Sequence, residues 1–122
     1  MGIGFHIKDY DCKARWSYTG FHRFRKRVAQ SLGLTLEIDS DFNWVTQDWI
    51  KWDKDWLLFL THSDCSGIFT FSQCGRISEK LKLVIDTWQP KDLQESYDIE
   101  HGMKLVEAMQ YCKANKKKIR LS

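Results

Sequence analysis

The sequence contains no apolar run that approaches the roughly 20 residues needed to cross a bilayer, so we expect no membrane-spanning segment. We also expect no secretion signal, because His6 and Lys8 interrupt the apolar residues at the N-terminus. Position 6 is His where N-myristoylation requires Ser or Thr. These absences favour a cytoplasmic protein with no membrane partner.

The four cysteines, Cys12, Cys65, Cys74 and Cys112, include no Cys-x-x-Cys pair. That spacing is the signature of zinc ribbons and thioredoxin-like redox sites, and both are therefore excluded. In a cytoplasmic protein we expect all four thiols to be free and reduced. Internal repeats, low-complexity tracts and interdomain linkers are absent as well, so the chain of 122 residues corresponds to a single domain, 1–122.

Aromatic side chains are abundant. They make up 14% of the chain and include six tryptophans. With 43% hydrophobic residues, a chain of this length can bury about two-thirds of its unfolded surface, which excludes a disordered protein. The 19 Lys and Arg against 16 Asp and Glu give a net charge of +3, too small and too dispersed to indicate nucleic acid by itself. Any tryptophans that are not buried in the core would lie on the surface and indicate contact with a partner or a ligand.

Hydrophobic periodicity predicts an α+β fold, with a small antiparallel sheet packed against helices. Alternation of apolar and polar residues predicts strands near 3–8, 13–18, 34–38 and 117–121, the first two forming a hairpin. Apolar residues spaced by three and four predict helices near 20–32, 47–60, 71–88 and 98–114.

Several residues mark the expected helix ends. Thr70 and Gln73 have the spacing of a capping box at the start of the 71–88 helix, which Pro90 ends. Thr19 is expected to cap the 20–32 helix, and Ser96 or Asp98 the 98–114 helix.

The most concentrated chemistry lies in 62–67, between an apolar run and the 71–88 helix. His62, Asp64 and Cys65 can ligate a transition metal, and a Cys–His pair can form a nucleophile. A structural turn is the competing interpretation, because Asp and Ser bond their own backbone and Gly67 tolerates a positive φ. We therefore take His62, Ser63, Asp64 and Cys65 as ligand or partner candidates and expect Asp64 to accept backbone N–H bonds; no catalytic or metal residue is assigned. An EF-hand is excluded by the spacing.

Four tryptophans fall within thirteen residues, at positions 44, 49, 52 and 56. The last three share one face of the predicted 47–60 helix. They form either a buried stripe or an aromatic patch that faces a partner. Trp44, Trp49 and Trp52 are the candidate partner residues.

A basic cluster lies on the predicted 20–32 helix, where the outer face is expected to carry Arg23, Arg25, Lys26 and Arg27. Such a face is commonly only solvated, but it can also bind phosphate or nucleic acid. Lys116, Lys117 and Lys118, near the C-terminus, can add to this cluster.

Two stretches resemble a group of small uncharacterised bacterial proteins. The stretches are Ser17-Tyr18-Thr19-Gly20-Phe21 with Phe24-Arg25, and Leu60-x-His62-Ser63-Asp64-Cys65-x-Gly67 with Thr70-x-x-x-Cys74. The group carries a His-Ser-Asp-Cys-Asp-Gly motif and has no established activity. Ser66 stands here in place of the second Asp, so a hard-cation site built on two carboxylates would lose one ligand. The resemblance implies one fold along the whole chain.

The leading functional expectation is a small non-enzymatic binding protein that acts through protein–protein contacts, as immunity proteins and bacterial or phage defence modulators do. It rests on the small size, the tryptophans and the lack of a complete catalytic set. One alternative is a metal- or ligand-dependent enzyme centred on His62, Asp64 and Cys65. Another is phosphate or nucleic-acid binding through the basic 20–32 helix. No cofactor is expected.

Overall fold

The structure is a computed structural model that describes residues 2–33, 37–38, 44–45, 53–61 and 67–122. The helices of these residues are α1 (Tyr18–Ser31), α2 (Lys54–Thr61), α3 (Phe71–Ile85) and α4 (Leu93–Asn115). The strands are β1 (Gly2–Ile3), β2 (Phe5–His6), β3 (Trp16–Ser17), β4 (Glu37–Ile38), β5 (Trp44–Val45), β6 (Ile68–Phe69) and β7 (Ile119–Leu121). All strand pairs are antiparallel, and the predicted α+β class is confirmed.

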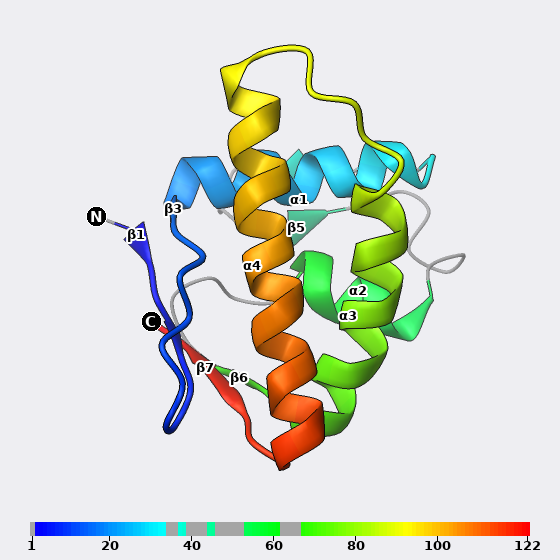
Figure 1. Ribbon diagram of the computed structural model, residues 1–122. Coiled ribbons are helices and arrows are strands. Elements are labelled where there is room, and N and C mark those ends of the chain that lie inside the picture. The colour runs from blue at the N-terminus through cyan, green and yellow to red at the C-terminus, as the bar shows by residue number, and fades with distance from the viewer. Residues whose placement is uncertain (1, 34–36, 39–43, 46–52, 62–66) are drawn as a thin grey trace.

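Helices α3 and α4 lie side by side and run in opposite directions (Figure 1). Two glycines let them pack closely against their neighbours. A Cβ at Gly75 would come within 2.7 Å of Lys113 Cδ, and a Cβ at Gly102 within 2.7 Å of Ile85 Cδ1. Helices α1 and α2 also contact α3, so all four helices of the described residues contribute to one apolar core.

Helix α3 begins as the sequence predicts. The backbone N–H of Gln73 donates to Thr70 Oγ1 at 3.3 Å, and the N–H of Thr70 donates to Gln73 Oε1 at 2.9 Å, which completes the capping box. The other two caps differ from the prediction. Ser17 rather than Thr19 caps α1, and Asp92 rather than Ser96 or Asp98 caps α4.

The sheet differs more from its prediction. The expected pairing of the first two strands is confirmed by β1 with β3, where Ile3 faces Trp16. Strand β2, however, pairs with the C-terminal strand in a three-stranded sheet of order β2-β7-β6, and β4 pairs with β5 alone. The predicted 3–8 strand is thus divided at Gly4 between two partners. The two-residue strands β5 and β6 are too short to show a period in the sequence.

The N-terminal segment is fixed to α4 by buried polar groups. Trp16 Nε1 donates to Asp98 Oδ1 at 3.2 Å, and the backbone N–H of Arg15 donates to His101 Nδ1 at 3.0 Å. The Tyr97 ring is stacked on the His101 ring, with centroids 4.1 Å apart. Asp98 is thus a buried acceptor rather than the helix cap that the sequence allowed.

Replacing Asp92 by Ala is expected to lower the free energy of unfolding by about 1 kcal/mol. The Asp92 carboxylate accepts the backbone N–H of Glu95 at 2.8 Å, and this donor has no partner inside the helix. Urea unfolding of the variant checks the value. Gln94→Ala, in the same exposed first turn, is the control and should change stability by only a few tenths of a kcal/mol.

Stability should also depend on His101 as the pH falls. Burial, with a smaller effect of Lys104, lowers the pKa of His101 below its usual value. The unfolded chain therefore takes up this proton at a higher pH than the folded protein, and stability is lost as the pH falls through the unfolded pKa of about 6.5. His101→Asn keeps an acceptor for Arg15 and removes the titration. Its urea midpoint should fall less than that of the wild type between about pH 7 and 5; equal falls would contradict this assignment.

Among the described residues, no helix combines the length and the apolarity needed to cross a membrane.

Candidate functional site

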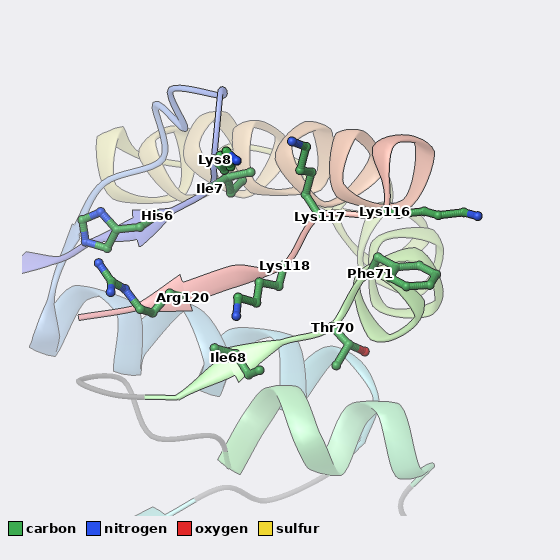
Figure 2. Close-up of a pocket in the computed structure, with 10 residues that line it drawn as sticks. All are labelled: His6, Ile7, Lys8, Ile68, Thr70, Phe71, Lys116, Lys117, Lys118 and Arg120. Carbon is green, nitrogen blue, oxygen red and sulfur yellow. The ribbon is translucent and has the colours of Figure 1, made fainter.

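A basic groove lies over the outer face of the β2-β7-β6 sheet (Figure 2). Alternation along β7 creates this face: Ile119 and Leu121 are buried, whereas Arg120 is exposed. Lys118, two residues before Arg120, is exposed as well. Because alternate residues of a strand point to opposite sides, one side of β7 supplies the core and the other supplies charge.

This groove, which we call the cationic groove, has a volume of about 710 Å³. Five of its described lining residues are cations, and none of the described lining residues is a carboxylate. The chain as a whole is nearly balanced, with 19 basic and 16 acidic residues, so the groove concentrates one sign of charge. The lining residues are His6, Ile7, Lys8, Ile68, Thr70, Phe71, Lys116, Lys117, Lys118 and Arg120.

The register of the sheet places three different side chains in one row. Arg120 is directly opposite His6 on one side and opposite Ile68 on the other. Directly opposed residues of antiparallel strands have Cβ atoms only about 4.5–5.5 Å apart. The imidazole, the guanidinium and the isoleucine therefore stand side by side, and all three residues are exposed.

The three lysines reach the groove because of the turn that follows α4. Lys116 adopts a left-handed conformation, with φ 53° and ψ 45°, and ends the helix. The N–H of Lys117 returns to the carbonyl of Cys112 at 2.9 Å, which is a common closure for a helix C-terminus. Lys117 Nζ lies 3.5 Å from Asp9 Oδ2 and is the most neutralised of the three, whereas Lys116 and Lys118 are exposed.

The start of α3 forms the far wall of the groove and adds apolar surface to it. Figure 2 shows Phe71 there, and Ile68 on the edge strand β6. Phe71 is 41% exposed and Ile68 42%, which is high for large apolar side chains. The N-terminus of a helix carries a partial positive charge. The N-terminus of α3 therefore adds to the positive potential that the lysines create in the groove.

Helix α1 places its arginines differently from the sequence prediction. Arg25 was expected on the outer face, but it is fully buried. Its guanidinium carbon lies 4.5 Å from the centroid of the Phe21 ring, and its NH1 donates to the carbonyl of Phe59 at 3.3 Å. Arg25 thus joins α1 to the end of α2 in the core.

Arg23 and Arg27 are directed toward carboxylates of α4. Arg27 Nε donates to Asp98 Oδ2 at 3.2 Å and its NH1 to Glu95 Oε1 at 2.8 Å, while Arg23 NH2 lies 3.7 Å from Asp98 Oδ1. Lys26 is half-buried. A phosphate at Arg23 or Arg27 would compete with carboxylates already in place, so this helix is a weaker anion site than the cationic groove.

The 62–67 motif lies almost wholly outside the described residues, as do its candidates His62, Ser63, Asp64 and Cys65. Both interpretations of this stretch, and the expected backbone bonds of Asp64, stay predictions. Gly67 is described and has a φ of 99°, which fits the positive φ expected there.

The tryptophan candidates are described only in part. Trp49 and Trp52 lie outside the described residues, and for Trp44 only the backbone, in β5, is described. Trp56 is buried and packs against Phe59 with ring centroids 6.4 Å apart. This one described member of the predicted stripe therefore faces the core.

The described cysteines, Cys12, Cys74 and Cys112, are free and buried. Burial raises the pKa of the Cys12 thiol, and a hydrogen bond with Cys112 together with burial raises the pKa of the Cys74 thiol. A thiol that stays protonated is a poor nucleophile, and Cys12 and Cys74 both lie in the apolar core. Within the described ranges, no three His, Cys, Asp or Glu side chains gather as metal ligands.

Sequence reasoning missed the cationic groove as a unit. Lys116, Lys117 and Lys118 were noticed, but as an addition to α1 rather than as part of a sheet face. One signal was present: the polar positions of the two terminal strands are basic, at His6 and Lys8 and at Lys118 and Arg120.

Comparison with known protein families, with curated proteins and with solved structures finds no match for this chain, so its function is inferred from the chemistry of the groove.

Proposed function

We propose that the protein is a binding protein whose ligand is an extended polyanion held in the cationic groove. One observation carries the proposal: five cations and no described carboxylate line a single hollow of about 710 Å³. Like charges gathered in a concave surface focus their field and attract a ligand of the opposite sign. A carboxylate or phosphate chain that follows β7 would contact Arg120, Lys118 and Lys116 in turn.

The placement of the cations suits a chain rather than a single small ion. Arg120 and Lys118 are two residues apart, which corresponds to roughly 6.6–6.8 Å along an extended strand. Lys8 and Lys116 extend the basic surface beyond the sheet. One phosphate or carboxylate cannot contact all of these groups at once, whereas a chain of them can.

Binding of inorganic polyphosphate, measured by calorimetry at several salt concentrations, tests the proposal. The logarithm of the association constant should fall linearly with the logarithm of the salt concentration, by about 0.7 per phosphate contacted if the coefficient of single-stranded nucleic acids applies. Three to five contacts predict a slope of roughly −2 to −3.5. No binding at low salt, or binding that salt does not weaken, would contradict the proposal.

A further inference from the structure

We infer that the polyanion is a single strand of nucleic acid and that Phe71 is the platform on which one of its bases stacks. This inference rests on the proposed function and names its ligand. Phe71 is 41% exposed and lines the same groove as Lys116, Lys118 and Arg120. An inorganic polyanion makes no use of a phenyl ring. A nucleotide strand uses both features, because its phosphates pair with cations and its bases stack on aromatic rings.

The composition of the groove favours nucleic acid over an acidic protein. Four of its five permanent cations are Lys and only one, Arg120, is Arg. Protein interfaces are depleted in Lys and enriched in Arg and aromatic residues. Lysine is a compact point charge on a flexible stem, which suits the mobile phosphates of a nucleotide chain.

The position of Phe71 favours an unpaired strand over a duplex. It is the first residue of α3, which follows the edge strand β6 of the sheet. In a duplex the bases are paired and stacked on one another, so their faces are covered and a ring on an open surface cannot stack on them. Bases of a single strand can turn toward the ring. The exposed His6 ring, opposite Arg120, is a second surface on which a base can lie.

The test compares ligands of equal length that differ in one feature. The probes are fluorescein-labelled oligo(dU), oligo(U), an abasic deoxyribose-phosphate strand, a DNA duplex and poly-glutamate, measured by fluorescence anisotropy. The wild type should bind oligo(dU) or oligo(U) about tenfold more tightly than the abasic strand, a factor typical of one stacked base. The DNA and RNA probes show which sugar the groove prefers.

Phe71→Leu keeps an apolar side chain and removes the aromatic face. It should lose most of the tenfold advantage of oligo(dU) over the abasic strand. A urea-unfolding midpoint close to that of the wild type shows that the variant is folded. Leu83→Ala, at the exposed far end of α3, is the control and should keep the advantage.

The outcomes separate this inference from the proposed function. Equal binding of oligo(dU) and the abasic strand, or no effect of Phe71→Leu, overturns the role of Phe71 and leaves polyanion binding intact. Poly-glutamate binding as tightly as oligo(dU) overturns nucleic acid in favour of an acidic protein segment. Duplex binding as tight as that of oligo(dU) overturns the single strand. If no polyanion binds, the proposed function fails as well.

Discussion

Replacing Lys116, Lys118 and Arg120 together by glutamine is expected to weaken polyphosphate binding by about 100-fold near 0.1 M salt. Each contact with a phosphate contributes a factor of roughly 5 at this concentration, because the association constant varies with salt to the power of about −0.7 per contact. Three lost contacts multiply to roughly 10². The salt slope should become shallower by about 2. Calorimetry at several salt concentrations measures both quantities.

A matched control separates the groove from net charge. Lys82, Lys91 and Lys104 do not line the cationic groove, and their triple replacement by glutamine removes the same charge. We expect this variant to bind polyphosphate within about twofold of the wild type, since none of the three lysines lines the groove and salt screens exposed charges that do not contact the ligand. Equal losses in the two triple variants would assign the binding to overall charge and not to the groove.

Replacing Asp98 by Ala should lower the free energy of unfolding by about 3 kcal/mol, the largest effect on stability that we expect. The Asp98 side chain is wholly buried and accepts from Trp16 Nε1 and from Arg27 Nε, both at 3.2 Å. Its removal leaves a buried indole N–H and a guanidinium that has lost one partner, which typically costs about 3–5 kcal/mol. Arg27 is 22% exposed and still pairs with Glu95, which places the value at the lower end.

Two further variants test this assignment of Asp98 by urea unfolding. Asp98→Asn keeps an acceptor for Trp16 and removes the charge, so its loss should be smaller than that of Asp98→Ala. Glu100→Gln changes a carboxylate on the same helix that is 62% exposed, and we expect a loss below about 1 kcal/mol. If Asp98→Ala unfolds at the same urea concentration as Glu100→Gln, the buried carboxylate does not stabilise the fold as its contacts indicate.

The start of α3 could be predicted because it depends on residues close together in the sequence. The strand pairing could not, because it depends on residues far apart in the sequence. The capping box of Thr70 and Gln73 acts over three residues and was visible in the sequence. The apolar spacing was visible as well, but it predicted a helix to residue 88, whereas α3 ends at Ile85. The pairing of β2 with β7 joins residues more than a hundred positions apart, and no local pattern records it.

Arg25 shows how residue type can mislead where spacing does not. It lies four residues after Phe21 and three before Val28, which places it on the buried face of α1. Its charge nevertheless suggested the solvent face, because Arg is rarely buried without a partner. The Phe21 ring and the Phe59 carbonyl are the partners that the guanidinium needs. The contact with Phe21 forms within α1, and the hydrogen bond to Phe59 forms only when α1 packs against α2.

The cationic groove was hidden for the same reason as the sheet. It combines residues 6–8, 68–71 and 116–120, three segments that only the folded chain brings together. Each segment alone is typical of a solvated strand edge, a helix start or a helix end. Only the register that places Arg120 between His6 and Ile68 makes them one surface.

The most direct test of the cationic groove is to map polyphosphate binding residue by residue, by following backbone amide NMR shifts during a titration. We predict chemical-shift changes that saturate together at residues 6–8, 68–71 and 116–120, while the amide shifts of 23–27 on α1 do not change. Shifts confined to 23–27, or an absence of shifts in all three groove segments while polyphosphate binds, would contradict the assignment of the groove as the binding surface.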